Sequence, residues 1–370
     1  MTATLKTTII QEPSSATANM TLDTSGNVTG GANLVATGMP YGSSSFLRNR
    51  IINGNMAVAQ RATSAALPVN NSSTYTTLDR FCSFCATGQT GTSSQVAAGL
   101  TGFQYALKLQ RTAANTATGN IDTGQAVETL NSVDLAGGSV TFSFYAKAGA
   151  NFSASGSAII IQLATGTGTD QSFSSMTGNG WTGQSNIINF VSQAITTTWA
   201  RYSFTATVAS TATQIGFQII YTPTGTAGAD DSLYITGVQL EQGSVATPFE
   251  RPLYGKQLAD CQRYYTQFGG VGGTALPVGQ AASTTGAYIP ILLPVSMRTA
   301  PTFSVSANSD WYMTNASVGS ALTWTASSIG GADIQACYLS ITVASGLVAG
   351  NASFAQAANT SARVKFTAEL

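Results

Sequence analysis

The chain has 370 residues, of which only 8% are charged, and its 15 basic and 15 acidic side chains give a formal net charge of zero. A typical globular domain has about 25% charged residues, so charge is scarce here. Without a basic stripe to neutralise phosphates, the chain is not expected to bind nucleic acid. No apolar run approaches the roughly 20 residues of a transmembrane helix, so we expect no membrane insertion.

The missing charges are replaced by threonine, serine, asparagine, glutamine, glycine and alanine. Threonine favours strands, whereas glycine, asparagine and serine favour turns. This balance indicates an all-β protein. An uncharged surface of hydroxyls and amides promotes self-association, and it also suits recognition of the neutral hydroxyls of sugars.

Residues 1–45 differ from the rest of the chain. They contain short strand-like pieces interrupted by Pro13, Gly26, Gly30 and Gly31, with few large apolar side chains. Such a segment cannot bury a core of its own. Two interpretations stay open: an attachment arm ordered by contact with another protein, or a disordered leader. The segment lacks the apolar region of a secretory signal peptide, so we expect synthesis in a cytoplasm without signal-directed secretion.

Residues 46–251 show repeated short strands in which apolar and polar side chains alternate, as in half-buried antiparallel sheets. Glycine- and asparagine-rich joints separate them. About ten strands over roughly 200 residues predict one large β-sandwich, best described as a jelly roll. The clearest strands span residues 139–147, 157–165, 185–193, 200–208, 213–222 and 232–241.

Residues 252–273 are predicted to connect two β domains. The segment 252–268 opens with a proline and closes before a glycine pair, which is typical of a helix. The glycine-rich joint 269–273 follows it. An apolar stripe of helical period supports the helix and comprises Leu258, Cys261, Tyr265 and Phe268.

Residues 274–370 form a second β domain of a size that suits a small sandwich. The predicted fold class is therefore all-β: a jelly-roll β-sandwich followed by a short connector helix and a smaller C-terminal β-sandwich. The predicted strands of this last domain read AYIPILLPVSM, TFSVSA, WYMTN, ALTWTAS, CYLSITVAS and ARVKFTAEL.

The four cysteines are interpreted as structural. Cys82 and Cys85 form a CxxC, a spacing seen in zinc and redox sites. However, RFCSFCA alternates as a strand does, and a zinc site needs four ligands. The chain has no histidine, and Cys261 and Cys337 are isolated. We therefore predict neither a metal nor any other cofactor.

Catalytic groups are also few, and the chain is predicted not to be an enzyme. Without histidine there is no Ser–His or Cys–His pairing. A glycosidase needs only two carboxylates, so distant acids leave that alternative open. Most acids, however, lie beside a turn or an arginine and are interpreted as structural, as for Asp79 with Arg80, Glu250 with Arg251, and Asp260 near Arg263. No fixed repeat of a long β-helix is present.

Binding residues are sought among the aromatics, because sugar sites combine aromatic rings with neutral hydrogen-bonding groups. Trp181 lies in the glycine-rich loop GNGWTGQ and is predicted to be exposed. Trp311, Tyr312 and Trp324 are further candidate ligand-binding residues in the C-terminal domain, whereas Trp199 is expected in the core. For each candidate taken alone, packing in a core or between subunits is favoured over contact with a ligand.

Several segments resemble phage tail-fibre-like proteins that contain a jelly-roll domain. Their motifs are FLRNRIINGNMAVAQRATS followed by YTTLDRF, LAGGSVTFSFYAKAG, and YITGVQLEQGSVATPFERPLYGKQLADCQRYY at 234–265. The last is the most specific, and the closing ARVKFTAEL and the opening segment also resemble fibre proteins. Together these segments cover about half of the chain.

The resemblance implies a virion protein of the tail-fibre type, made in the host cytoplasm. It implies a homotrimer that attaches to other virion proteins through residues 1–45 and binds a host-surface glycan. No heptad run is present, so a coiled coil would not hold the trimer together. Two alternatives stay open: a head fibre or capsid decoration protein, and a polysaccharide-degrading tailspike enzyme.

The jelly roll also resembles the carbohydrate-binding modules attached to glycoside hydrolases. Those modules often hold a structural Ca²⁺ between their first and last strands. The corresponding stretches here, 53–56 and 235–238, contain no carboxylate, so this site is not carried over. Asp230 and Asp231 in the preceding loop are interpreted as solvated turn residues.

Overall fold

The structure is a computed structural model, and it describes residues 9–10, 20–22, 28–30, 48–70, 74–315 and 321–370. The chain forms two compact units, Met1–Leu47 and Arg48–Leu370. Most of the predicted arm, residues 1–45, lies outside the described residues. Three short strands are described there and pair into one antiparallel sheet: β1 (Ile9–Ile10), β2 (Met20–Leu22) and β3 (Val28–Gly30).

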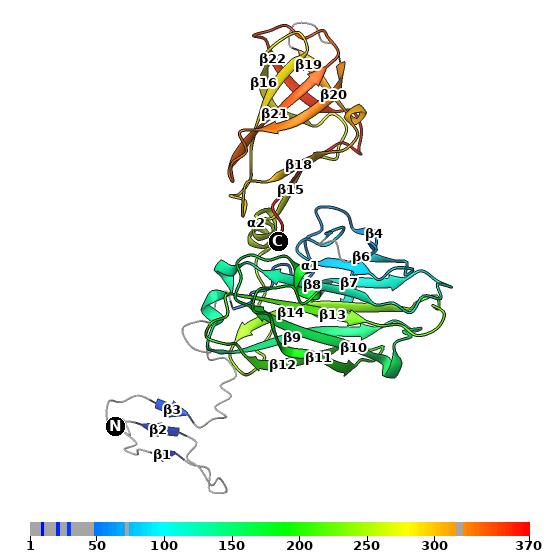
Figure 1. Ribbon diagram of the computed structural model, residues 1–370, viewed down its shortest axis with the longest axis vertical. Helices are drawn as coiled ribbons and strands as arrows, with labels where there is room; N and C mark the ends of the chain where they lie inside the picture. Colours follow the sequence, from blue (N-terminus) through cyan, green and yellow to red (C-terminus); the bar gives the residue numbers. More distant parts are fainter. Residues whose placement is uncertain (1–8, 11–19, 23–27, 31–47, 71–73, 316–320) are drawn as a thin grey trace, which may run out of the picture. The chain divides into compact units, whose positions relative to one another are not determined.

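The second unit begins with a β-sandwich of two antiparallel sheets (Figure 1). The five-stranded sheet has the order β11-β10-β13-β8-β5, and the six-stranded sheet has the order β12-β9-β14-β7-β6-β4. The predicted all-β class and the β-sandwich predicted for this part of the chain are confirmed. The strands are β4 (Ser64–Ala66), β5 (Cys82–Cys85), β6 (Gly91–Leu100), β7 (Phe103–Arg111), β8 (Ile121–Val127), β9 (Ser139–Ala148), β10 (Ala158–Gly166), β11 (Ser185–Ala194), β12 (Ala200–Thr207), β13 (Gln214–Tyr221) and β14 (Ser232–Gln242).

Alternating side chains of the two sheets build the core of the sandwich. Ile159, Ile161 and Leu163 of β10 are all buried in this core. The rings of Phe142 on β9 and Phe217 on β13 meet between the sheets with centroids 4.8 Å apart. Burying one such side chain contributes about 1.5–3 kcal/mol, so the period-two pattern of the sequence determines which face each strand turns inward.

The connector differs in part from its prediction. Helix α2 spans Tyr254–Gln262 and not 252–268, and the chain continues as strand β15 (Tyr265–Gly269). Strand β15 pairs with β23 (Arg363–Thr367), which provides hydrogen-bond partners along one edge of the strand. Tyr265 and Phe268 fit a helical stripe, but aromatic residues fit a paired strand equally well. Tertiary pairing therefore ends the helix earlier than its periodicity indicates.

The C-terminal domain is all β, as predicted, and its main sheet closes on itself where two stacked sheets were expected (Figure 1). Six strands form a closed barrel in the order β16-β17-β21-β20-β19-β22, and β15, β23 and β18 form a separate sheet. Closure removes unpaired strand edges from the barrel. The strands are β16 (Ala275–Ala281), β17 (Gly286–Leu292), β18 (Thr302–Val305), β19 (Trp311–Asn315), β20 (Ala321–Gly330), β21 (Ala336–Val343) and β22 (Ala352–Ala357).

Helices are few in this fold. Besides α2, one short α-helix, α1 (Phe173–Thr177), packs its buried residues Phe173 and Met176 against the five-stranded sheet. Neither α-helix of the described residues has the length and apolar character needed to cross a bilayer. Strands therefore provide nearly all of the scaffold on which any site must be built.

Glu369, which follows β23, makes buried ionic contacts with the jelly roll. One carboxylate oxygen accepts a hydrogen bond from Arg61 at 2.8 Å, and the other pairs with Arg80. The side chains of Arg80 and Glu369 are 1% and 7% exposed, so this pair is almost completely removed from water. Arg80 also donates to the carbonyl oxygen of Ala126 at 2.7 Å.

Two consecutive tyrosines cover these arginines. The Arg80 guanidinium lies 3.7 Å from the ring centroid of Tyr264, and the Arg61 guanidinium lies 3.7 Å from that of Tyr265. A desolvated cation–π contact contributes about 2 kcal/mol. Arg61, Arg80, Tyr264, Tyr265 and Glu369 are called the junction cluster below, because they join β15 and the residues after β23 to the jelly roll.

Replacing Glu369 by glutamine tests the junction cluster. The variant Glu369→Gln keeps the shape of the side chain and leaves Arg80 buried without its counter-charge. We expect the free energy of unfolding to fall by about 3–5 kcal/mol, as measured by urea denaturation at pH 7. The control is Asp260→Asn, whose exposed i,i+4 pair with Lys256 stabilises by no more than about 0.5 kcal/mol. Equal losses in the two variants would contradict the role of the cluster.

Candidate functional site

Trp181 was predicted to be exposed, and this prediction is wrong. The side chain is 4% exposed and packs with Phe173 and Met176 in a hydrophobic cluster on the five-stranded sheet. Its indole Nε1 donates to the carbonyl oxygen of Ser172 at 2.9 Å. A Cβ at Gly216 would lie only 2.9 Å from the indole ring, so the ring occupies the space above this glycine. The glycine-rich loop therefore folds back onto the sheet and buries its tryptophan.

Trp311 and Trp324 fill the interior of the C-terminal barrel. They are 0% and 2% exposed, and their rings stack with centroids 5.2 Å apart and an interplanar angle of 17°. Neither indole Nε1 has a hydrogen-bond partner among the described residues. Tyr312 is half-buried, and the alternation of β19 places it on the face opposite to Trp311. The four candidate residues therefore do not form one site, and the three indoles offer no open ring face.

The outer face of the barrel carries an aromatic surface that was not predicted from the sequence. Tyr288 of β17 and Tyr338 of β21 are 50% and 41% exposed. Their rings meet edge to face, with centroids 5.2 Å apart and an interplanar angle of 81°. Pro290 is the cross-strand neighbour of Tyr338, and these three residues line an open depression. They are called the tyrosine platform below.

Gly330 fixes the ring of Tyr338. The two residues are cross-strand neighbours on β20 and β21. A Cβ at Gly330 would overlap the far end of the Tyr338 ring, so the ring lies across the glycine backbone. A ring held in this way loses little further conformational freedom when a ligand stacks on it, which favours binding.

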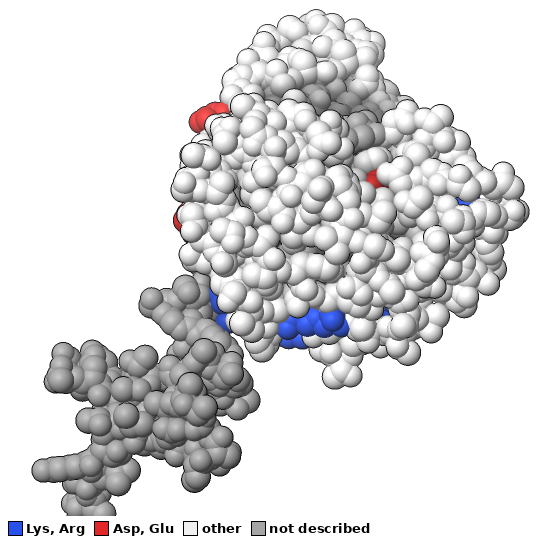
Figure 2. Space-filling view, turned by 60° about the horizontal axis from the view of Figure 1, so that its bottom comes forward, with Lys and Arg blue, Asp and Glu red and all other residues white. Residues whose placement is uncertain are grey.

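The surroundings of the tyrosine platform are neutral. Gln280 is the cross-strand neighbour of Tyr288 on one side, and Ser340 is its neighbour on the other. The six barrel strands contain no lysine, arginine, aspartate or glutamate. Most of the face drawn in Figure 2 is likewise free of charged atoms. Such a surface can stack on apolar groups and exchange hydrogen bonds with hydroxyls, but its strands hold no carboxylate to transfer a proton.

A signal for the platform was present in the sequence. In AYIPILL the buried residues are Ala287, Ile289 and Ile291, and Tyr288 therefore stands on the outer face. The same alternation in CYLSITV places Tyr338 outward. An aromatic residue at a position that alternation assigns to solvent is a usable signal. The register that brings the two tyrosines together is not encoded in either strand alone.

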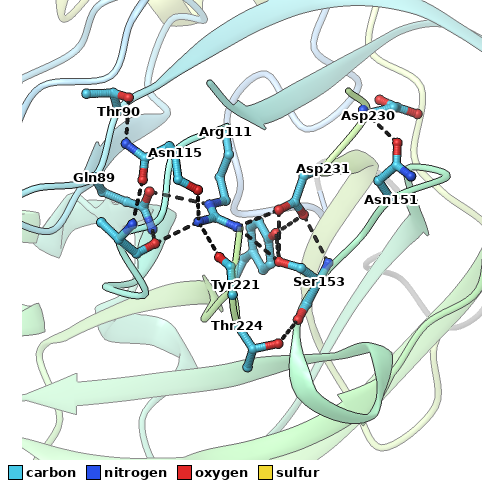
Figure 3. A network of polar contacts seen from close by, with 12 residues as sticks. Gln89, Thr90, Arg111, Asn115, Asn151, Ser153, Tyr221, Thr224, Asp230 and Asp231 are labelled. Carbon is cyan, nitrogen blue, oxygen red and sulfur yellow. Dashed lines mark hydrogen bonds and ion pairs between the residues drawn. The ribbon is translucent and has the colours of Figure 1, made fainter. Parts of the chain in front are cut away.

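A second polar cluster lies among the loops at one end of the jelly roll (Figure 3). Arg111 and Asp231 form an ion pair of 2.6 Å in which both side chains are 0% exposed. The Asp231 carboxylate also accepts hydrogen bonds from Ser153 and Tyr221. The expectation that Asp231 is a solvated turn residue is therefore wrong. Asp230, by contrast, is partly exposed and pairs with Lys108 at 3.1 Å.

The Arg111 cluster has a structural role. Its guanidinium donates to the carbonyl oxygens of Asn115, Ala117 and Gly225, at distances between 2.7 and 3.0 Å. Because Gly225 lies in a loop far in sequence from the loop that contains Asn115 and Ala117, one buried cation holds two loops together. All of these partners are mutually satisfied, which is the condition under which a buried charge is tolerated.

The cysteines behave as the structural interpretation predicted. Cys82, Cys85, Cys261 and Cys337 are all buried, and none forms a disulfide. Cys82 and Cys85 lie in strand β5, and burial raises the pKa of the Cys82 thiol well above its usual range. A raised thiol pKa disfavours the thiolate that metal binding and redox exchange require. Among the described residues, no group of three or more His, Cys, Asp or Glu is placed to hold a metal ion.

Asp79 and Asp260, which lie near arginines in the sequence, have structural roles, but they pair with other residues than those arginines. Asp79 pairs with Arg61 at 3.4 Å, and Asp260 pairs with Lys256 at 2.6 Å. Burial raises the pKa of Asp79 to about 6, although the nearby Arg61 acts in the opposite direction. Sequence neighbourhood therefore indicated the kind of role correctly without indicating the partner.

Asp122 on β8 is a buried carboxylate with a strongly raised pKa. It is 0% exposed, and Gln218 donates a hydrogen bond to it at 2.6 Å. Burial raises its pKa to about 7, while the hydrogen bonds from Gln218 and Asn120 act to lower it. Its surroundings explain this shift without a catalytic role.

The Asp122→Asn variant tests this shift. Because the folded pKa exceeds the unfolded value of 3.8, protonated Asp122 stabilises the fold below pH 4, and this contribution is lost as pH rises to about 7. In the wild type, the free energy of unfolding therefore falls by up to about 1.4 kcal/mol per pH unit over this range, and the variant does not show this decrease. Urea denaturation at pH 4.5, 6 and 7.5 should show the wild type losing stability relative to the variant. The exposed Asp333→Asn should follow the wild type, and a wild-type slope in Asp122→Asn would refute the shift.

Comparison with known proteins gives no family membership: no family model and no curated protein matches the sequence. The structural neighbours are mainly β-sandwich carbohydrate-binding modules. One belongs to family 4 (15% identity, TM-score 0.30), covering 52% of this chain and 98% of that chain. Another, of family 61 in complex with β-1,4-galactotriose, has 12% identity and a TM-score of 0.30, and covers 53% and 99%.

A phage protein is also among the structural neighbours. It is the enzymatically active domain of tailspike protein 4 of bacteriophage CBA120, with 11% identity and a TM-score of 0.32. The match covers 53% of this chain and only 21% of the tailspike chain. Likenesses of this extent describe neighbours in fold and assign no ligand to this chain.

Proposed function

We propose that this protein is a non-catalytic glycan-binding protein that presents the tyrosine platform of its C-terminal barrel to neutral saccharides. One observation carries the proposal: Tyr288 and Tyr338 are half exposed, in mutual edge-to-face contact, on a barrel whose strands hold no charge. The C–H faces of a sugar ring pack on aromatic faces, and its hydroxyls bind neutral polar groups such as Gln280 and Ser340.

The apolar neighbours of the platform strengthen the case for an interaction surface. Leu292 lies two residues beyond Pro290 on β17 and is 77% exposed, and Val278 on the adjacent β16 is 62% exposed. Contiguous apolar side chains on a surface mark interaction sites, whereas scattered ones are ordinary. Pro290 also has no backbone N–H, and its ring adds a rigid apolar face beside Tyr338.

A virion role of the tail-fibre type is the second part of the proposal. It is supported by the sequence resemblance at 234–265, which covers most of strand β14, the connecting residues 243–253 and helix α2. In this proposal the chain is a homotrimer made in the host cytoplasm, and residues 1–45 attach it to other virion proteins. The charge-poor surface is compatible with burial between subunits. A head fibre or capsid decoration protein is the alternative.

Antibody labelling of intact virions in the electron microscope tests this location. Label on the tail is expected, and label on the capsid alone would favour the decoration protein and contradict the tail-fibre role. Sedimentation of the purified chain tests the oligomeric state, for which a trimer is expected and a monomer would be contrary.

A glycan array with the full chain tests the binding function. The wild type is expected to bind neutral host-surface saccharides, and the double variant Tyr288→Ala/Tyr338→Ala should bind at least about tenfold more weakly, since a loss of 1.4 kcal/mol is tenfold. Tyr254→Ala is the matched control, because Tyr254 is 60% exposed on α2 and lies outside the platform. Unchanged binding by the double variant would reject the platform, and release of reducing ends would reject the non-catalytic role.

Gly330→Ala tests the platform without removing an aromatic ring. The added methyl group overlaps the Tyr338 ring and must displace it, so we expect weaker glycan binding with little change in unfolding temperature. Gly255→Ala is the control, because a Cβ at Gly255 meets no atom within 4 Å. Isothermal titration calorimetry measures the glycan affinity of both variants. Equal affinities of the two variants would show that the orientation of Tyr338 does not matter.

A further inference from the structure

The outer face of the six-stranded jelly-roll sheet carries a row of lysines and aromatic rings. Tyr234 on β14 is the cross-strand neighbour of Lys147 on β9 and of Lys108 on β7. Trp199 immediately precedes β12, beside Lys147. Trp199, Lys147, Tyr234 and Lys108 are called the lysine–aromatic row below. It lies in the jelly roll and shares no residue with the tyrosine platform of the barrel.

The rings of this row are held in place. The Trp199 indole Nε1 donates to the carbonyl oxygen of Ala98 at 2.9 Å, which pins the edge of the ring. The rings of Trp199 and Tyr234 meet edge to face with centroids 6.5 Å apart and an interplanar angle of 74°. The Lys147 ammonium lies 4.6 Å from the Tyr234 centroid and 5.4 Å from that of Trp199. Both rings therefore help to position this cation.

The row has an unbalanced positive charge. Lys108 lies 5.2 Å from the Tyr234 centroid and pairs with Asp230 at 3.1 Å. Lys147 has no carboxylate partner within 4 Å among the described residues. Two ammonium groups thus flank one tyrosine, with a single carboxylate between them. In a chain with so few charges, such a local excess favours an anionic ligand.

The neighbouring strand β12 adds a second cation that has no carboxylate partner within 4 Å among the described residues. Arg201 is the cross-strand neighbour of Tyr145, which precedes Lys147 by two residues on β9. Its guanidinium donates to the Ser143 hydroxyl at 3.0 Å, lies over the ring of Tyr145, and has no carboxylate partner within 4 Å in the described part of the chain. A ligand that reaches from Lys147 toward β12 therefore meets a second positive group.

We propose that the lysine–aromatic row binds an acidic saccharide. The acid group of the sugar pairs with the Lys147 ammonium, and the pyranose ring packs against the exposed parts of Trp199 and Tyr234. Neutral hydrogen-bonding groups on adjacent strands, such as Gln110 and Ser94, can bind sugar hydroxyls. A polynucleotide fits less well, because phosphate recognition along a strand needs a longer series of cations than Lys147 and Arg201.

The test uses a glycan array that pairs acidic saccharides, both carboxylated and phosphorylated, with neutral counterparts of the same backbone, such as oligogalacturonate and its methyl ester. The wild type should bind at least one acidic member about tenfold more tightly than its neutral counterpart, with a preference that decreases as salt rises. In the variant Lys147→Met, which keeps an apolar stem of similar length, the preference should disappear.

Lys365→Met is the matched control. Lys365 is also a half-buried strand lysine without a carboxylate partner within 4 Å in the described residues, but no aromatic ring lies under its ammonium. It should retain the acidic preference, as should Tyr288→Ala/Tyr338→Ala, so failure of this site is distinguishable from failure of the tyrosine platform. The proposal is overturned if no acidic glycan is preferred to its neutral counterpart, or if Lys147→Met keeps the preference of the wild type. It is also overturned if a single-stranded oligonucleotide displaces the acidic glycan and the neutral glycan of the same backbone binds as tightly as the acidic one.

Discussion

The scarcity of charge is the constraint on which the rest of this structure depends, and the pair of Arg80 with Glu369 shows how the chain uses the charges it has. That pair is almost completely buried, lies under the ring of Tyr264, and joins the residues after β23 to the jelly roll. The Arg111–Asp231 pair does the same for loops at the end of the sandwich. Buried ion pairs stabilise less than their Coulomb energy indicates, but removing one partner is costly, so such pairs specify how segments must meet.

Because several of the few charged side chains are buried in ion pairs, the outer surface is made largely of hydroxyls, amides and small apolar groups. On the barrel, whose strands are uncharged, this surface exposes the Tyr288–Tyr338 pair. On the jelly roll, Lys147 is an exception, a cation held over aromatic rings without a carboxylate partner in the described residues. With two different surfaces, the proposed protein would recognise neutral and acidic parts of a glycan separately.

The alternation of apolar and polar residues predicted the parts of this architecture that depend on local sequence. Alternation correctly located strands such as 139–147 and 213–222, and the all-β class followed from them. Alternation failed where long-range contacts determine the local structure. Strand β15 replaces the end of the predicted helix because β23 pairs with it. Trp181 is buried because its loop folds over Gly216. The tyrosine platform was missed because the candidates were limited to tryptophans and Tyr312, and because only cross-strand register brings Tyr288 and Tyr338 together.

The central claim, that the barrel binds glycan through its tyrosine platform, is tested most directly by ¹⁹F NMR of the full chain labelled with 3-fluorotyrosine. Resonances of Tyr288 and Tyr338, assigned by single Tyr→Phe variants, should shift on titration with a saccharide that binds in calorimetry. The resonance of Tyr254, exposed on α2, should stay unchanged. Saturable binding that leaves the Tyr288 and Tyr338 resonances in place would contradict the claim.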